Sequence, residues 1–204
     1  MAKDNNKADS SQEILKPQGA GKARLIAIIM VILAIIIGTR SSLMGLRREA
    51  LSYFTDGDPS NKLDYGIQYD LDERVKFANH MIVVGKRYLG ENDAFIANIL
   101  NDSAKLQKAT DPSDKFKYNE QLGADCYALL EYLDKLNLAG SIDINDTDMT
   151  LLVEAWVDME SSNQKMGHSS YNTKAREFNA ILEQFPTNIT RLIAFVKPLT
   201  LFDY

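Results

Sequence analysis

The acidic loop that begins at Asp143 is the stretch closest to a metal-binding pattern. Oxygen-bearing side chains occupy positions 1, 3, 5 and 12 of an EF-hand-like count, and these are Asp143, Asn145, Thr147 and Glu154. Position 6, which needs glycine for its sharp turn, is Asp148, and no helix is expected directly before the loop. Calcium binding stays open as an alternative. We interpret the stretch as a solvated loop that leads into a helix, and we expect no metal site.

The two histidines, His80 and His168, lack the neighbours that catalysis would need. They fall on different expected helices, without carboxylates or cysteines at the spacing of zinc ligands or acid–base partners. The single cysteine, Cys126, excludes an internal disulfide and a cysteine-based zinc site. Nucleotide-binding, hydrolase, metalloprotease and di-iron bundle motifs are absent from the sequence. We therefore expect no catalytic residues and no cofactor, and a protein that is not an enzyme.

An aromatic repeat near the C-terminus is the most regular pattern in the sequence. Aromatic residues recur at intervals of seven, each followed by asparagine or proline: Tyr171-Asn172, Phe178-Asn179 and Phe185-Pro186. This interval places the aromatic rings on one seam of a helix and the asparagines about 100° further round, where they can hydrogen-bond to an adjacent helix. Aromatic packing in a core accounts for the pattern without any ligand.

The elements that would carry these residues are all expected to be helices. Glycine and proline number 11 and 5, which is too few for the regular turns of a β-rich fold. Apolar spacing predicts helices over residues 41–55, 69–88, 92–109, 114–136, 147–184 and 188–195. Asp111-Pro112-Ser113 provides a break and a cap, Gly90 and Gly140 act as breakers, and Asp146 or Thr147 can cap the following helix.

The expected helix over residues 147–184 carries two apolar stripes that are out of register. The first stripe comprises Leu152, Trp156, Met159 and Met166, and the second comprises Tyr171, Ala175, Phe178, Leu182 and Phe185. The slip falls at Gly167-His168-Ser169-Ser170, where small polar residues interrupt the apolar face. Such a slip changes the local packing geometry of a helix, so it predicts a bend or a repacking there.

An uncharged apolar run extends from Leu25 to Thr39, between Arg24 and Arg40. As a helix it covers about 22 Å, short of a hydrocarbon layer of about 30 Å, and basic side chains that reach the headgroups can extend it. We interpret it as a transmembrane helix over residues 23–40. A cleaved signal peptide and a buried core helix are the alternatives, but the arginine at the end of the run disfavours cleavage. Basic residues on the N-terminal side slightly outnumber those beyond the run, which leaves the side of the bundle open.

The charge is divided along the chain. Residues 1–40 carry six basic and three acidic residues, whereas residues 41–204 carry seventeen and twenty-five. An acidic body argues against nucleic-acid binding. The sequence thus divides into a disordered polar tail (1–22), the transmembrane helix (23–40), an antiparallel bundle of long helices (41–195) and a C-terminal tail (196–204).

The aromatic repeat resembles the C-terminal helix of the LemA family of bacterial membrane proteins, in which an aromatic-asparagine repeat runs into Phe-Pro. Here it reads YNTKAREFNAILEQFP, residues 171–186. A looser similarity covers a second helix, in which the matching residues are Ile67, Gln68, Leu71, Arg74, Lys86 and Tyr88. The proline-containing segment of the family is replaced by residues 77–81, and the loop 56–61 is inserted. The resemblance implies a single-pass bacterial membrane protein with no established enzymatic activity.

These observations predict a non-enzymatic helical bundle, coiled-coil-like in packing, that is anchored in the bacterial cell membrane and acts as a scaffold or adaptor. Its expected partners are the lipid bilayer and other proteins, with homo-oligomers as an option and no nucleic acid. The alternative is a sensory or ligand-binding bundle, suggested by the register slip and the polar residues Asn163, Gln164 and His168.

Overall fold

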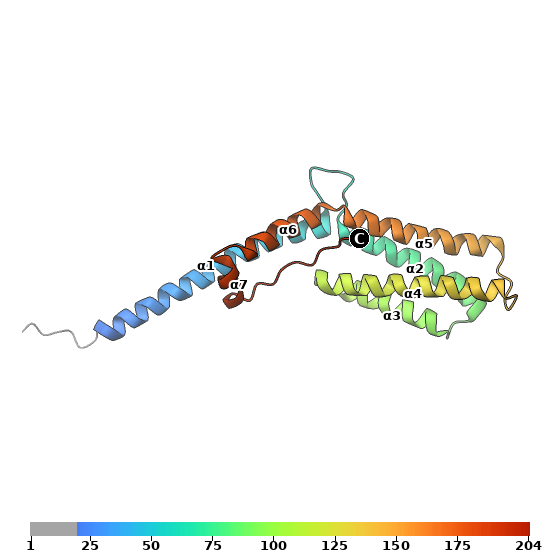
Figure 1. Cartoon of the computed structure of the whole chain (residues 1–204), viewed down its shortest axis with the longest axis horizontal. Coiled ribbons are helices and arrows are strands. Elements are labelled where there is room, and N and C mark those ends of the chain that lie inside the picture. Colours follow the sequence, from blue (N-terminus) through green and yellow to red (C-terminus); the bar gives the residue numbers. More distant parts are fainter. Residues whose placement is uncertain (1–19) are drawn as a thin grey trace, which may run out of the picture.

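The computed structural model describes residues 20–204, which are all-α as the apolar periodicity predicts. Within this range there are seven helices and no strand. In chain order they are α1 (Ala20–Asp56), α2 (Ile67–Leu89), α3 (Ala94–Lys108), α4 (Pro112–Leu138), α5 (Asp146–Gly167), α6 (Ser170–Glu183) and α7 (Thr187–Ile193) (Figure 1). Of the polar tail expected over residues 1–22, residues 1–19 lie outside the described part of the chain. Residues 20–22 are the first three residues of α1.

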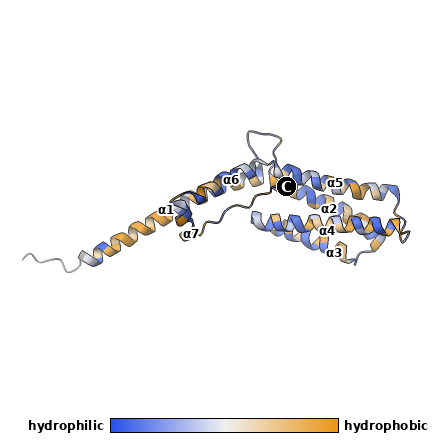
Figure 2. Ribbon diagram, in the orientation of Figure 1, coloured by the Kyte–Doolittle hydropathy of each residue, from blue (hydrophilic) through white to orange (hydrophobic). Residues whose placement is uncertain are grey.

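Helix α1 joins the apolar run and the helix expected over residues 41–55 into one continuous helix of 37 residues. In the part of the chain that the structure describes, it is the one helix long and apolar enough to cross a membrane. None of its most apolar window is buried against the rest of the protein, which contradicts the alternative of a core helix. Figure 2 shows this half of α1 as a largely orange rod that projects from the folded body.

Helices α2 to α5 form a four-helix bundle at the end of the molecule away from the apolar rod (Figure 1). Helix α2 packs on α5 and α3 packs on α4, and α2 also contacts α3 and α4. The buried apolar side chains of the four-helix bundle include Leu71, Val75, Ile82, Ile96, Ile99, Leu122, Leu129, Leu133, Leu152 and Met159. Each large aliphatic side chain stabilises the fold by about 1.5–3 kcal/mol when fully buried, so this shared core holds the amphipathic helices together.

The second half of α1 packs against α6 and α7 rather than inside the four-helix bundle. The buried residues on α1 are Leu43, Ala50 and Phe54, and those facing them on α6 are Tyr171, Ala175, Phe178 and Leu182. Leu46 has the same helical spacing but is 36% exposed. The molecule is therefore a bundle joined to an α1–α6 pair, from which the apolar rod continues.

The helix expected over residues 147–184 is divided at the predicted register slip. Helix α5 ends at Gly167, and α6 begins at Ser170 with Ser169 as its N-cap. The Ser169 hydroxyl accepts a hydrogen bond from the Tyr171 N–H at 3.3 Å. The break lets the first stripe face α2 and the second face α1, so the predicted repacking is confirmed. At the start of α5 the cap is Asn145, not Asp146 or Thr147.

Residues 196–204, expected to be a tail, are part of the packed structure. The chain leaves α7 and returns in extended form along α6 to the α5–α6 break (Figure 1). Val196, Leu199 and Phe202 are buried on the way. Pro198 prevents a helix here, and the three-residue spacing of the apolar side chains gives no helical or strand signal in the sequence.

Candidate functional site

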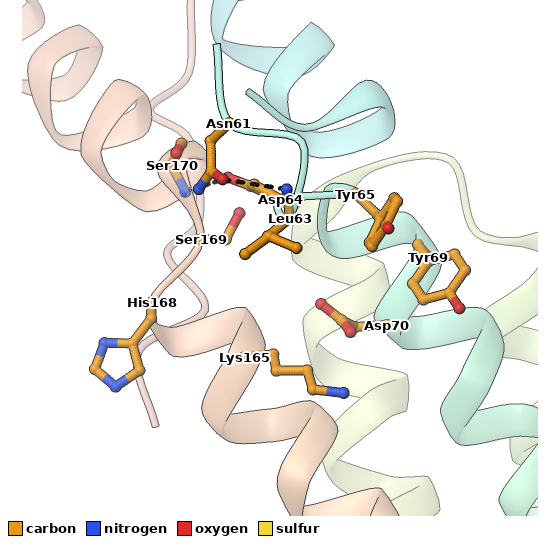
Figure 3. A pocket seen from close by; sticks show the side chains of 10 residues that line it. All are labelled: Asn61, Leu63, Asp64, Tyr65, Tyr69, Asp70, Lys165, His168, Ser169 and Ser170. Carbon is orange, nitrogen blue, oxygen red and sulfur yellow. Dashed lines mark hydrogen bonds between the residues drawn. The ribbon is translucent and has the colours of Figure 1, made fainter. Parts of the chain in front are cut away.

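A pocket opens at the break between α5 and α6. We call it the waist pocket, and its volume is about 360 Å³. It lies between the loop after α1, the start of α2 and the end of α5, and is lined by Asn61, Leu63, Asp64, Tyr65, Tyr69, Asp70, Lys165, His168, Ser169 and Ser170 (Figure 3). Hydroxyl, carboxylate and ammonium groups dominate this lining, so the pocket suits a small polar ligand rather than an apolar one.

Asp70 gives the waist pocket its main electrostatic feature. Partial burial raises the pKa of its carboxyl to about 6, opposed by the positive charge of Lys165 and assisted by the negative charge of Asp64. Figure 3 shows Asp70 on α2 and Lys165 on α5 at the same side of the pocket. In the described part of the chain no direct ion pair joins Asp70 to any cation. A cationic group on a ligand could therefore pair with this carboxylate.

Asp64 fixes the rim of the waist pocket. Its carboxylate accepts hydrogen bonds from the Gly66 N–H at 3.0 Å and from the Ser170 N–H at the start of α6, also at 3.0 Å. Two glycines with positive φ, Gly57 and Gly66, close the loop that carries Asp64. A Cβ on Gly57 would lie 1.9 Å from the Asp64 carbonyl oxygen, so only glycine fits there.

The waist pocket does not assemble the groups that a metal or an acid–base reaction would use. Within residues 20–204 no cluster of three or more histidine, cysteine, aspartate or glutamate side chains could hold a metal ion. The ring of His168 is directed away from Asp70 (Figure 3). Cys126 is buried elsewhere, and burial raises the pKa of its thiol to about 12, so it stays protonated.

A second concave feature is the shallow groove between α4 and α5, which we call the α4–α5 groove. Its volume is about 500 Å³, and its lining comprises Arg74, Glu120, Gly123, Ala124, Tyr127, Trp156, Glu160, Asn163 and Tyr204. Tyr127 and Trp156 lie with their ring centroids 5.3 Å apart, and Tyr127 is 46% exposed. Tryptophan, tyrosine and arginine are the residue types that dominate binding energy at protein interfaces.

Arg74 forms the floor of the α4–α5 groove. Its side chain is 1% exposed, its guanidinium donates to the Met159 carbonyl, and its nearest carboxylate is Glu160 at 3.9 Å. The Nε of this guanidinium is buried and has no hydrogen-bond partner among residues 20–204. Desolvation lowers the pKa of Arg74, although it remains a cation at neutral pH. Gly123 makes room for it, because a Cβ there would lie 2.8 Å from Nη2.

The asparagines of the aromatic repeat bind the extended C-terminal segment, residues 195–204, and Asn172 also binds the end of the adjacent helix α5. The Asn179 amide donates to the Leu199 carbonyl and accepts from the Leu199 N–H, both at 2.8 Å. Asn172 pairs in the same way with Phe202, at 3.0 and 2.8 Å. It also donates to the Met166 and Gly167 carbonyls at the end of α5. The repeat therefore holds the C-terminal segment and joins α5 to α6.

The three aromatic residues of the repeat differ in burial. Tyr171 is buried, its hydroxyl donates to the Thr200 carbonyl at 2.8 Å, and its ring meets that of Phe54 edge-on. Phe178 is also buried. Phe185 is 80% exposed and lies outside the core, so the seam of three rings expected from the spacing contains two. Pro186 lies three residues beyond the end of α6 and directly before α7.

The acidic loop before α5 is bound to residues of α2. Asp148 is buried and accepts hydrogen bonds from the Arg87 guanidinium and from the Tyr88 hydroxyl, the latter at 2.8 Å. Tyr88 in turn accepts from the Asn145 amide at 3.0 Å. Lys86, the remaining residue of the second-helix similarity, is half-buried and forms no part of either concave feature.

Asp70 was not singled out in the sequence, and Arg74 was named there only as part of the resemblance, without a place in a groove. Asp70 and Arg74 both lie at positions of α2 that helical spacing assigns to the inner face, between Ile67 and Ala78. Charged residues on an expected apolar face are the signal that could have marked them. Of the polar residues proposed at the register slip, His168 borders the waist pocket, Asn163 lines the α4–α5 groove, and Gln164 is exposed.

Comparison with known proteins adds no assignment. No protein-family model matches the chain, and no curated protein matches it either. The resemblance to the LemA family therefore rests on the motif in residues 171–186 and on the order of the helices.

Proposed function

We propose that this chain is a non-enzymatic helical bundle, anchored in a bacterial cell membrane by α1, that holds partner proteins at the membrane surface. The observation that carries the proposal is the continuity of α1. Its apolar half is free of the rest of the chain, and its second half supplies Leu43, Ala50 and Phe54 to the core. A continuous helix of this kind would hold the folded body at a fixed position next to the membrane.

The same continuity supports an anchor over a cleaved signal peptide. Helix α1 runs through Gly38 and Thr39 without a cap or a break. Directly beyond them, the Arg40 guanidinium donates to the Ala194 carbonyl after α7. Cleavage next to Arg40 would cut a regular helix where it contacts another element, whereas signal-peptide cleavage sites follow small residues in an accessible segment.

The α4–α5 groove is the surface that we assign to partner proteins. It presents Tyr127 and Trp156 beside the buried guanidinium of Arg74, a combination typical of interface hot spots. It also lies on the bundle, away from the apolar rod (Figure 1). A partner bound there would not compete with the membrane.

A photo-crosslinking residue at Tyr127 tests this assignment in intact membranes. Tyr132 is the matched control, because it lies on the same helix but stacks on Phe95 of α3, with ring centroids 4.8 Å apart. The proposal expects a protein adduct from the groove position and none from the control. Recovery of an unmodified monomer from both positions would contradict the assignment.

A ligand-binding bundle is the second candidate, and the waist pocket favours it. The Asp70 carboxylate and the Lys165 ammonium lie at the break where α5 and α6 can change their relative packing. Thermal unfolding of the full chain with small amines, amino acids and divalent ions would detect a ligand as a rise in Tm. The rise should disappear in Asp70→Asn. No shift with any compound would argue against this candidate.

We further propose that the chain is a divergent LemA-like protein. The contacts of Asn172 and Asn179 support this proposal, because both asparagines of the motif have a structural role: they bind the backbone of the C-terminal segment. The departures in residues 77–81 and 56–61 lie on α2 and in the rim of the waist pocket, away from that contact.

A further inference from the structure

An exposed apolar patch surrounds α7. Its five members are all at least half exposed: Phe185, Ile189, Leu192, Ile193 and Phe195. Ile189 and Ile193 lie four residues apart on one face of α7, and Phe185 and Phe195 flank the two ends of this helix. The two phenylalanine rings are 80% and 84% exposed. Single exposed apolar side chains are ordinary, but five large ones within the eleven residues 185–195 are typical of a contact surface.

The patch lies beside the apolar half of α1. Helix α7 packs on α1, and the Arg40 side chain, at the end of the apolar run, donates to the Ala194 carbonyl. Figure 1 shows α7 against α1 where the free half of that helix begins. The patch therefore sits at the depth where a membrane-spanning α1 would leave the hydrocarbon layer.

Phe195 occupies a position that usually requires glycine. The Val196 N–H donates to the Arg191 carbonyl at 2.9 Å and the Phe195 N–H to the Leu192 carbonyl at 3.3 Å, which is the Schellman pattern at a helix end. Phe195 has a φ of 54° and is the one non-glycine residue with positive φ among residues 20–204. A bulky side chain in this conformation is strained, and residues held in such strain often lie at functional sites.

We propose that α7 and its flanking residues insert into the boundary between headgroups and acyl chains of the same membrane that α1 spans. This inference rests on the proposed anchor. Continuity argues for lipid as the occupant, because the patch extends the apolar surface of α1, whose run covers only about 22 Å of a layer of about 30 Å. Aromatic and aliphatic side chains beside basic ones are typical of helices that lie in this boundary.

The charges next to the patch agree with a lipid surface. Basic residues adjoin it at Arg40, Arg191 and Lys197, and Glu183 is the one acidic residue between residues 183 and 197. Phosphate headgroups would meet these cations while the apolar side chains enter the acyl region. A second copy of the chain on the same patch would instead bring like charges together.

Depth-dependent quenching tests the insertion in the full chain. The protein, with Trp156→Phe to remove its single tryptophan, is reconstituted into vesicles of phosphatidylcholine and phosphatidylglycerol with brominated acyl chains. Reporters are Leu33→Trp in the apolar run, Leu192→Trp and Phe195→Trp in the patch, and Leu138→Trp at the end of α4 as an exposed control. Leu138 is 79% exposed and lies at the far end of the bundle. Circular dichroism confirms that each variant folds.

We expect quenching at positions 33, 192 and 195 and none at 138, with bromines near the headgroups quenching position 195 more than bromines deep in the chain. If the tryptophan at position 33 is quenched but those at positions 192 and 195 are quenched no more than the control at 138, the insertion of α7 is overturned and the anchor is not. Protection of position 195 from aqueous acrylamide without lipid quenching would assign the patch to a second copy, which also overturns it. An absence of quenching at 33 would overturn the anchor and this inference together.

Discussion

Asn172 and Asn179 lie one heptad apart on α6, and each pairs with both backbone groups of one residue in the C-terminal segment. Seven helical residues rise about 10.5 Å, and three extended residues span about 10 Å. The interval between the asparagines therefore matches the interval between Leu199 and Phe202. This match explains why asparagine recurs at these positions: its amide carries a donor and an acceptor side by side, as a peptide group of a β-ladder does.

Substitution of Asn172 should destabilise the protein more than substitution of Asn179. In Asn172→Ala the buried N–H and carbonyl of Phe202 lose their partners, at a cost of roughly 2–4 kcal/mol in the free energy of unfolding. Asn179 is only half-buried, so water can replace its amide in Asn179→Ala. Urea unfolding followed by circular dichroism measures both. Equal losses of unfolding free energy in the two variants would contradict the larger role that we assign to the buried Asn172–Phe202 pair.

Asp70 should make stability depend on pH. Its pKa is about 6 in the folded protein, against 3.8 for an unperturbed aspartate, so the folded state binds the proton more tightly. The stabilisation from this group is complete below pH 3.8 and is lost as the pH rises to about 6. Asp70→Asn should remove this dependence, so that its Tm exceeds that of the natural chain at neutral pH but not in acid. Parallel pH profiles of Tm for the two proteins would contradict the assignment.

At the scale of elements, the loop between α1 and α2 determines how the α1–α6 pair meets the bundle. Gly57 and Gly66 close it, and Asp64 accepts a hydrogen bond from the first N–H of α6, that of Ser170. The loop was recognisable from its aspartates, glycine and proline. Its contact with α6, more than a hundred residues away, depends on tertiary packing and has no local signal.

Alanine at Gly57 should be far more disruptive than alanine at Gly140. Both glycines have positive φ, which alone costs alanine about 1 kcal/mol. At Gly57 the new methyl group would also lie 1.9 Å from a backbone oxygen, whereas Gly140 has open space. We expect a loss of more than about 2 kcal/mol for Gly57→Ala. Similar midpoints of chemical unfolding for the two variants would show that the loop relaxes freely.

Helix positions were largely predictable from the sequence, because caps and apolar spacing are local. Asp111 caps α4 as expected, and the register slip marks the break before α6. The C-terminal segment was not predictable, because Pro198 removes the helical signal and the partners of Leu199 and Phe202 are side chains on α6. The α4–α5 groove and the waist pocket arise from packing between helices. Their local signals were limited to the inner-face charges Asp70 and Arg74 and to the polar residues Asn163 and His168 near the register slip.

At the scale of the whole molecule, the C-terminal segment connects the α1–α6 pair to the bundle. The Phe202 ring contacts Phe54 of α1 and Phe116 of α4, with centroids 5.5 and 5.3 Å apart. It is fully buried. Edge-to-face aromatic contacts of this kind each contribute about 0.5–1.5 kcal/mol beyond burial. Phe202 thereby packs on both the α1–α6 pair and the bundle, in addition to the direct contact between α1 and α2.

Removal of that side chain should separate the two parts of the molecule. We expect Phe202→Ala to cost about 3–5 kcal/mol in the free energy of unfolding. Protease cleavage in the loop between α1 and α2 should accelerate, while the α2–α5 bundle keeps its helical signal. Phe185→Ala is the matched control, because that ring is 80% exposed. A loss in the control as large as in Phe202→Ala would contradict this role.

The fold also changes the charge comparison that bears on membrane orientation. Arg191 and Lys197 join Arg40, Arg47 and Arg48 on the bundle side of the apolar run, because α7 packs on α1. The opposite side carries Lys3, Lys7, Lys16, Lys22 and Arg24. The small excess that favoured a cytoplasmic N-terminus disappears, since positive charges near both ends are now equal in number.

The most direct test of the membrane-anchored bundle is to ask whether the apolar run stays with the folded protein in the membrane. The chain is expressed in bacteria, the membranes are washed with alkaline carbonate, and the retained protein is analysed by mass spectrometry. The proposal predicts that the protein remains in the washed membranes with residues 25–40 still attached. A protein released into the soluble fraction, or one that begins beyond the apolar run, would contradict it.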